Sequence, residues 1–318
     1  MKNRIQDLKD VVESNLNVDV HSITKVDGGL VHYVYRIKTD QGIIFAKIRE
    51  SHYSALPNIT TNPELILYEK KAIEILSKLE PQKFPQLLFY ISHKNLLLLS
   101  DIMPERTTFE MKLNRYEIRE KDCYFLGKNL ADIHKKLSFV DVLIREDGDV
   151  EFYNQILFYR FGYHKHPAFD EVIDQLKKGQ KQPILGDLSP KNIGFSTKRT
   201  YTFCDLENFH YGNTVCDTGF LGASIIIHTI NNSTLVYKLL LSFLRGYSSI
   251  SKLNINNLTL KRIVLGIVLY RLDNLVIPYK ISITNKARKE KVKAIKKLLY
   301  KKKISWKKLV ETVTINKL

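Results

Sequence analysis

Cysteine is scarce in this chain of 318 residues. The three cysteines, Cys123, Cys204 and Cys216, are an odd number and show no metal-ligand spacing. A disulfide framework or a structural zinc site needs several cysteines at regular spacings. The sequence therefore favours a protein of a reducing compartment that is held together by its hydrophobic core.

Long hydrophobic runs are also missing. The longest apolar stretch, residues 219–227, is shorter than the roughly 18–20 residues that cross a bilayer. The first 17 residues place Ile5, Leu8 and Val12 at helical spacing with acidic residues among them, whereas a signal peptide needs an uninterrupted apolar core. We therefore expect a cytoplasmic protein without a membrane span.

Acidic residues are few beside basic ones: 33 Asp and Glu against 50 Lys and Arg give a net charge of +17. Residues 286–318 contain thirteen Lys or Arg and two Glu, so they carry +11 of this charge. Such a tail either binds nucleic acid, anionic lipid or another anionic partner, or forms the solvated side of amphipathic helices. Apolar residues at helical spacing favour the second interpretation, and nucleic-acid binding is the alternative.

The chain does contain a run of oxygen-bearing side chains after residue 185. Asp187 is followed five residues later by Asn192 and thirteen residues after that by Asp205, at the end of an apolar run. Magnesium takes one or two carboxylates and completes its shell with water and phosphate. In protein kinases an Asp accepts the hydroxyl proton and an Asn five residues on holds metal. The spacing indicates phosphoryl transfer, although the same residue types also form ordinary turns.

Glycines and a lysine with suitable placement lie upstream. Gly28 and Gly29 separate two predicted strands, and glycine lets backbone amides approach phosphate closely. Lys47 lies in a predicted apolar strand, 43–48, which follows the hairpin turn 40–42. In a kinase such a lysine binds nucleotide phosphates; otherwise the glycines form a turn and the lysine points to solvent from an edge strand.

A glutamate that could orient Lys47 lies on the next helix. Asn62 as a cap and Pro63 at the first position predict where that helix begins. Glu69 is chosen over Glu64 and Glu74 as the partner of the lysine, and the alternative is that all three are surface charges.

Segments of this chain resemble the aminoglycoside phosphotransferase and choline kinase-like superfamily of small-molecule kinases. They are Gly28-Gly29-Leu30, Leu130-Ala131-Asp132-Ile133-His134, Gly186-Asp187-Leu188-Ser189-Pro190-Lys191-Asn192-Ile193, Cys204-Asp205-Leu206-Glu207 and Asp217-Thr218-Gly219-Phe220. Four positions depart from the pattern. Leu185 replaces a usual His, Leu206 a commoner Phe, His32 a frequent Asn, and Ser189 the Lys of protein kinases.

The resemblance implies an α+β, two-lobed protein kinase-like fold. Residues 1–103 would form an N-terminal nucleotide-binding lobe with an antiparallel sheet and one main helix. Residues 104–318 would form a mainly helical lobe for catalysis and acceptor binding, with Lys-rich C-terminal helices. Apolar periodicity predicts helices at 122–137, 220–230, 235–244, 258–275 and 286–299.

The resemblance also implies the roles of individual residues. Asp187 would position and deprotonate the acceptor hydroxyl, and Asn192 and Asp205 would hold Mg2+. The nucleotide, ATP or possibly GTP, would contact Gly28, Gly29, Lys47, Glu69 and a hinge of Ser100, Asp101 and Ile102. Asp217 would support the catalytic loop, Glu207 would assist the metal, and His134 would pack in the core.

The acceptor would be a small molecule with a hydroxyl group, such as an amino alcohol, a sugar or an aminocyclitol. The shortage of acids speaks against a polycationic aminoglycoside. Residues 138–183 either line the acceptor pocket or form a surface insertion, and Arg271-Leu272-Asp273 is expected to reach the pocket. Candidate pocket residues are Asn154, Tyr159, Tyr163, His164 and His166. The rival hypotheses are a kinase-like factor that binds nucleic acid or protein through its basic tail, and an inactive nucleotide-binding scaffold.

Overall fold

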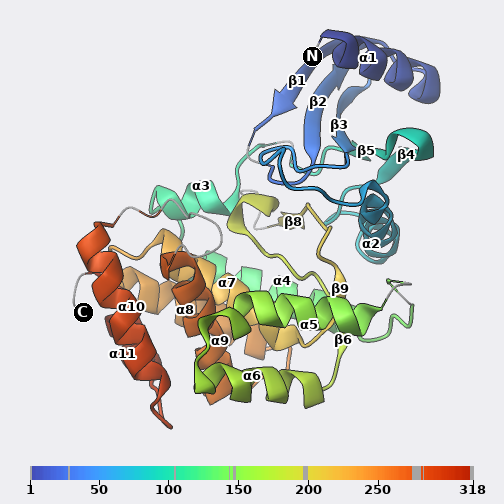
Figure 1. Ribbon diagram of the computed structural model, residues 1–318. Helices are drawn as coiled ribbons and strands as arrows, with labels where there is room; N and C mark the ends of the chain where they lie inside the picture. The colour runs from blue at the N-terminus through green and yellow to red at the C-terminus, as the bar shows by residue number, and fades with distance from the viewer. Residues whose placement is uncertain are drawn as a thin grey trace. The chain divides into compact units, whose positions relative to one another are not determined.

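The computed structural model describes residues 2–27, 29–103, 105–142, 144–145, 148–195, 200–273, 281 and 283–315. The chain divides into two compact units (Figure 1). The first comprises residues 1–106 together with 202–207, and the second comprises 107–201 and 208–318. The short segment 202–207 therefore belongs with residues that precede it by about a hundred positions.

A five-stranded antiparallel sheet forms the centre of the first unit, in the order β1-β2-β3-β5-β4. The strands are β1 (Val20–Val26), β2 (Tyr33–Thr39), β3 (Gly42–Ile48), β4 (Leu87–Ile91) and β5 (Leu96–Ser100). A 3-10 turn, η2 (Ser92–Lys94), joins β4 to β5. The predicted hairpin is confirmed: Thr39 pairs with Gly42, whose φ of 129° suits glycine.

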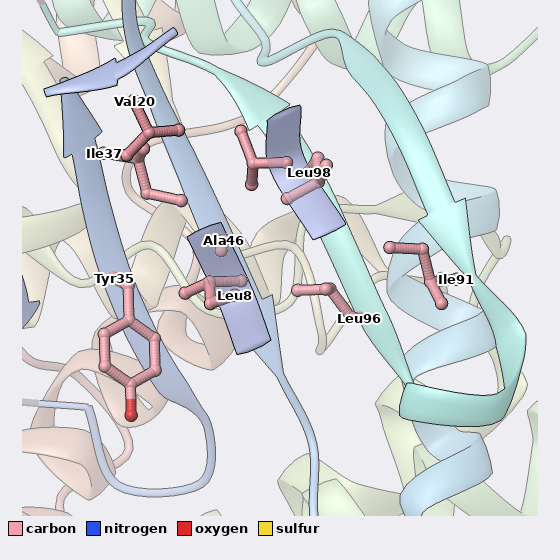
Figure 2. Close-up of a cluster of buried hydrophobic side chains, with 9 residues drawn as sticks. Leu8, Val20, Tyr35, Ile37, Ala46, Ile91, Leu96 and Leu98 are labelled. Carbon is pink, nitrogen blue, oxygen red and sulfur yellow. The ribbon is translucent and has the colours of Figure 1, made fainter. Parts of the chain in front are cut away.

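Helix α1 (Lys2–Leu16) packs on one face of this sheet (Figure 2). The buried hydrophobic side chains of the helix and the sheet form one cluster, which consists of Leu8, Val12, Val20, Tyr35, Ile37, Ala46, Ile91, Leu96 and Leu98. Side chains alternate between the two faces of a strand. Because Ala46 points into this cluster, its neighbour Lys47 points to the opposite face of the sheet.

Helix α2 (Ile66–Leu79) follows the 3-10 turn η1 (Pro63–Leu65). The side chain of Asn62 accepts a hydrogen bond from the Glu64 N–H at 3.0 Å, and Pro63 takes the first position of the turn. This confirms the predicted helix start. The buried side of α2 carries apolar residues and one acid, Glu69.

The second unit is mainly helical. Its helices are α3 (Phe109–Asn114), α4 (Glu120–Leu137), α5 (Asp149–Arg160), α6 (Pro167–Lys178), α7 (Thr214–His228), α8 (Ser233–Ser248), α9 (Leu258–Asp273), α10 (Asn285–Leu299) and α11 (Trp306–Val313). Its short strands β6 (Gln182–Ile184) and β9 (His210–Gly212) pair with each other. The strand β7 (Ile193–Phe195) also lies in this unit, whereas residues 202 and 203 of β8 (Tyr201–Phe203) belong to the first. The predicted α+β class, with an N-terminal antiparallel sheet followed by a mainly helical part, is confirmed. Within the described ranges no helix is both long and apolar enough to cross a membrane.

Helices α4 and α8 form the most extensive helix pair of this unit. Their backbones approach closely at two glycines. A Cβ atom on Gly127 would lie 2.1 Å from the carbonyl oxygen of Phe243, and one on Gly246 would lie 1.9 Å from that of Tyr124. Only glycine allows this crossing.

One helix prediction needs correction. Helix α7 begins at Thr214 rather than at residue 220, because Asn213 caps it through a hydrogen bond from the Val215 N–H. Residues 138–183, for which no helix was predicted, contain α5, α6 and the turn η3 (Gly162–His164). Residues 274 and 275 of the predicted helix 258–275 lie outside the described residues.

Candidate functional site

Lys47 is the centre of a buried charge cluster in the first unit. Its ammonium nitrogen lies 2.7 Å from Oε1 of Glu69 and 2.5 Å from Oδ1 of Asp205. Lys47 is 6% exposed and Glu69 is 1% exposed, and buried charges of this kind persist only when they are paired. The structure thus brings together three predicted site residues that lie 22 and 158 positions apart in sequence.

Asp205 has a left-handed backbone conformation, with a φ of 61°. For a residue other than glycine this conformation costs about 1–2 kcal/mol. The next peptide is held in place because the Leu206 N–H donates to Oε1 of Glu69 at 3.1 Å. Strained backbone conformations that the surroundings enforce are concentrated at binding and catalytic sites. The conformation of Asp205 therefore marks it as a candidate site residue.

Arg49 adds a second cation two residues after Lys47. Its Nη1 lies 3.4 Å from Oε2 of Glu207, its Nε donates to the carbonyl of Asn62 at 3.1 Å, and its Nη2 donates to the hydroxyl of Thr61 at 2.8 Å. No sequence motif marked Arg49 as a site residue. The available signal was its two-residue spacing from Lys47, which turns both side chains to the same face of an extended chain.

His32 completes the cluster as a neutral ring. Its Nδ1 lies 3.5 Å from Glu207 and its Nε2 lies 3.9 Å from Glu69. Burial and the nearby charge of Lys47 lower the pKa of His32 to about 2. Ligand atoms of His32, Glu69 and Asp205 lie within 4.8 Å of one another. Because Lys47 already binds both carboxylates and magnesium prefers oxygen ligands, this triad fits a charge-paired cluster better than a metal cage.

Carboxylates outnumber cations in this cluster, with Glu69, Asp205 and Glu207 against Lys47 and Arg49. Burial raises the pKa of Glu69, and burial together with the charge of Asp205 raises that of Glu207. Burial alone would lower the pKa of Lys47, but the attraction of Asp205 and Glu69 outweighs it and raises that pKa. Lys47 therefore remains charged, whereas Glu207, with a pKa raised to about 8, holds a proton near neutral pH.

The second unit contains Asp187, in a mostly buried loop after β6. The carboxylate of Asp217, fully buried in the first turn of α7, accepts hydrogen bonds from the N–H groups of Leu185 at 2.8 Å and Gly186 at 2.9 Å. His134 Nε2 donates to the same carboxylate at 3.0 Å. Burial would raise the pKa of Asp217, but these three donors lower it. An ionised Asp217 thus fixes the two residues directly before Asp187.

His134 is a buried structural residue, as the sequence predicted. With Nε2 donating to Asp217, its Nδ1 accepts the hydroxyl hydrogen of Tyr247 at 2.7 Å. Both ring nitrogens are therefore used in orienting the loop.

Gly186 requires glycine at its position. Its φ is 81°, and a Cβ atom there would lie 1.9 Å from the carbonyl oxygen of Asn208. The Gly186 carbonyl accepts a hydrogen bond from the guanidinium of Arg160, at the end of α5. This guanidinium stacks over the ring of Phe220 at 4.8 Å. No sequence motif marked Arg160, although it binds the peptide next to Asp187.

His210 is a histidine on a neighbouring strand, next to this loop. Leu185, which is buried, occupies the position within the loop where a histidine is usual. His210 lies on β9 opposite Ile184, and its Nδ1 donates to the carbonyl of Asn208 at 2.6 Å. Its ring packs against Phe152 and Tyr153. Burial lowers the pKa of His210 to about 4.

Asn192 ends the 3-10 turn η4 (Pro190–Asn192) on the same loop as Asp187. Its N–H donates to the carbonyl of Ser189 at 2.9 Å, and the residue is buried. The second unit thus presents the predicted Asp and Asn from one short loop.

The other predicted nucleotide contacts are Gly28, Gly29, Ser100, Asp101 and Ile102. Gly28 lies outside the described residues. At the end of β5, the Ser100 hydroxyl accepts a hydrogen bond from the Gln86 N–H at 2.8 Å, and Oδ1 of Asp101 accepts one from the Met103 N–H at 2.8 Å. These side chains therefore shape the chain where the hinge was predicted, and their role in binding stays a prediction.

The predicted acceptor residues lie on α5, η3 and the start of α6. Tyr159 and Tyr163 are exposed, whereas His164 is buried against Phe169. His166 caps α6 by accepting the Ala168 N–H at 3.2 Å. In the described part of the chain, no group of potential metal ligands includes His164 or His166.

The Arg271-Leu272-Asp273 segment lies at the end of α9. Arg271 is buried, donates to the hydroxyl of Ser224 at 2.9 Å and stacks over Phe220. Asp273 lies 3.5 Å from the ammonium of Lys296. Both residues thus have structural contacts within the second unit.

Solved structures show where this fold occurs. The chain is similar to the amicoumacin kinase hAmiN in complex with AMP-PNP, Ca2+ and Ami (14% identity, 94% and 96% of the two chains, TM-score 0.58). It is also similar to APH(2")-IIia in complex with GDP and kanamycin (14%, 92% and 97%, 0.57) and to the choline kinase LicA from Streptococcus pneumoniae (13%, 98% and 99%, 0.55). No family model and no curated protein sequence matches the chain. The likeness establishes an aminoglycoside phosphotransferase and choline kinase-like fold over most of the chain.

Proposed function

We propose that this protein is a cytoplasmic phosphotransferase that moves the γ-phosphoryl group of ATP, or of GTP, to a hydroxyl group of a small molecule. The observation that carries the proposal is the buried Lys47, whose ammonium is held by Glu69 on α2 and by Asp205. An ammonium fixed in this way binds phosphate oxygens in kinases, where the transfer depends on positioning and charge neutralisation. The nucleotide ligands of hAmiN and APH(2")-IIia support the same assignment.

Asp187 is the proposed catalytic residue. Asp217 accepts hydrogen bonds from the N–H groups of Leu185 and Gly186, and Arg160 donates to the Gly186 carbonyl, so the backbone directly before Asp187 is held in place. A carboxylate positioned in this way accepts the proton of the acceptor hydroxyl as the hydroxyl attacks phosphorus. Fixed placement matters because a bound, oriented hydroxyl reacts far faster than one that must be captured from solution.

Magnesium suits the oxygen donors that are proposed as its ligands. Asp205 offers a carboxylate and Asn192 a carboxamide, which are suitable ligands for this ion. When bound, the metal supplies positive charge to the phosphates, and Asp205 and Asn192 are the residues proposed to hold it.

The acceptor is proposed to be an amino alcohol, a sugar or an aminocyclitol-like compound. Choline kinase and kinases of amicoumacin and kanamycin-type ligands share the fold, and the chain itself has few acids to bind a polycation. Neutral or singly charged acceptors therefore come first in a screen.

Thermal unfolding with nucleotides tests the proposal, because a ligand that binds only the native state raises the melting temperature. We expect ATP to raise Tm more in the presence of magnesium than in its absence, and one acceptor class to raise it further. The Asp187→Ala variant should keep the nucleotide shift but lose turnover of that acceptor by about 10²–10⁴-fold, the usual contribution of a general base.

The Asp141→Ala variant, which removes an exposed carboxylate of the same unit, is the matched control and should behave as the wild type. Absence of any nucleotide shift would contradict the proposal. Full activity of Asp187→Ala would remove this residue from the mechanism.

A further inference from the structure

The segment of residues 205–207 is held at three successive points by side chains of the first unit. The Asp205 carboxylate lies 2.5 Å from the ammonium of Lys47, and the Leu206 N–H donates to Glu69 at 3.1 Å. The Glu207 carboxylate lies 3.4 Å from the guanidinium of Arg49. These three consecutive contacts, to the end of β3 and to α2, explain why this short segment belongs to the first unit.

Under the proposed function, on which this inference rests, one of the three contacts has to change. Lys47 has to bind nucleotide phosphates and Asp205 has to bind metal, so their direct contact is exchanged when the nucleotide enters. The segment then needs another attachment to keep Asp205 in its left-handed conformation. The contact between Glu207 and Arg49 involves no group that is needed for phosphate.

Arg49 is well placed for this task. It is 7% exposed, and Asn62 and Thr61, just before η1, receive hydrogen bonds from two of its nitrogens. The guanidinium therefore connects the end of β3, the approach to α2 and Glu207. A planar guanidinium with several donors can hold such a geometry, whereas a lysine cannot bind all these partners at once.

We propose that Arg49 is a positioning residue that acts through Glu207. It keeps the 205–207 segment attached to the sheet while Asp205 exchanges Lys47 for magnesium and nucleotide. Arg49 itself does not touch the phosphates.

The first experiment compares Arg49→Met, Glu207→Gln and the double variant by thermal unfolding with saturating ATP across a range of magnesium concentrations. Each single variant should raise the magnesium concentration for half-maximal stabilisation about tenfold. If Arg49 acts through Glu207, the double variant should lie within about twofold of the single variants, because coupled residues are not additive. Lys38→Met, which removes an exposed cation of β2, should match the wild type.

The second experiment needs no ligand and no activity. Hydrogen exchange of a peptide covering residues 203–209 should be at least fivefold faster in Arg49→Met and in Glu207→Gln than in the wild type or in Lys38→Met. The exchange rate of Arg49→Lys, which keeps the charge but not the planar donors, should lie between those of Arg49→Met and the wild type. This variant and Glu207→Gln decide the matter if Arg49→Met does not fold.

Unchanged exchange and an unchanged magnesium requirement would overturn the proposal. Fully additive losses in the double variant would also overturn it, since Arg49 would then act independently of Glu207. If the wild type shows no shift with any nucleotide, the proposed function fails, and the exchange of residues 203–209 alone decides whether Arg49 holds the segment.

Discussion

The Asp217 carboxylate holds the loop before Asp187, the proposed catalytic residue, through the N–H groups of Leu185 and Gly186. Replacing Asp217 by Asn leaves the shape almost unchanged but puts an N–H₂ group where one of three donors now finds an oxygen. A buried donor that loses its acceptor costs about 1–3 kcal/mol, and more when a charge is involved. We expect Asp217→Asn to lower the free energy of unfolding by about 2–4 kcal/mol, measured by urea denaturation.

The matched control for this substitution is Asp141→Asn, at an exposed position of the same unit. It should change the unfolding free energy by less than about 0.5 kcal/mol. Equal stability of the two variants would show that Asp217 does not fix the loop.

His210 makes stability depend on pH in a direction that follows from its burial. Its pKa is lowered to about 4 in the folded protein, whereas an unfolded histidine titrates near 6.5. Between these values the unfolded chain binds a proton that the folded protein does not, so stability falls as the pH drops below about 6.5. The contribution between pH 7.5 and pH 5 is about 2 kcal/mol.

Urea denaturation at pH 7.5 and pH 5 measures this contribution. The His210→Asn variant retains an N–H donor for the Asn208 carbonyl but does not titrate. Its loss of stability between the two pH values should be smaller than that of the wild type by about 2 kcal/mol. An identical loss in both proteins would mean that His210 is protonated when folded.

At the scale of helices, the crossing of α4 and α8 depends on two glycines. A methyl group on Gly127 or Gly246 would collide with the backbone of the partner helix. We expect Gly127→Ala and Gly246→Ala each to lower the free energy of unfolding by about 1–3 kcal/mol or more, the range for overpacked cores. Thermal or urea unfolding would measure the loss.

Gly222→Ala in α7 is the control for helix propensity. A Cβ atom there would meet only the flexible side chains of Leu240 and Val264, at 3.2 and 3.6 Å. Alanine favours a helix over glycine by about 1 kcal/mol, so this variant should be near neutral. A similar loss at all three sites would contradict the role of backbone contact.

Helix α4, which has one apolar side, could be predicted from the sequence, whereas helix α5, which has none, could not. Helix α4 has its buried residues at helical spacing and was placed within two residues of its true start. Helix α5 exposes Val150, Phe158 and Tyr159 while burying Tyr153 and Leu157. Apolar residues on several sides leave no periodic stripe to detect.

Some residues of the candidate site could likewise be predicted from the sequence, and others could not. Lys47, Asp187 and Asp205 could be selected because phosphoryl transfer restricts residue types at certain spacings. Arg49 and Arg160 could not, because what defines them is a contact across the fold: 158 positions separate Arg49 from Glu207. Local patterns carry no information on such pairs.

For the molecule as a whole, the C-terminal region carries much of the positive charge, and the lysines of α10 lie on the exposed side of that helix. Ile295, Leu298 and Leu299 are buried, whereas Lys286, Lys289, Lys293 and Lys297 are exposed. The structure thus supports a solvated helix side in this region. Exposed charges of this kind contribute little to stability.

Replacing these four exposed lysines by glutamine tests the rival nucleic-acid hypothesis. We expect each replacement to change the unfolding free energy by less than about 0.5 kcal/mol, with the nucleotide shift unchanged. Binding of a single-stranded oligonucleotide, measured by fluorescence anisotropy, should be weak. The slope of the logarithm of the binding constant against the logarithm of the salt concentration should become shallower by about 0.7 for each phosphate contact removed. Tight binding that persists at physiological salt and is lost in the variant would favour the rival function.

The division of the first unit has a consequence for synthesis on the ribosome. Residues 1–106 emerge first, with Lys47 and Arg49 already in the sheet, but their partners Asp205 and Glu207 follow only after about a hundred more residues. Glu69 is available to Lys47 within residues 1–106, but Arg49 cannot pair with Glu207 until residue 207 leaves the exit tunnel, and a buried cation is costly without its counter-charge. The first unit, although it begins the chain, is completed only after residues 107–201 of the second unit have been made.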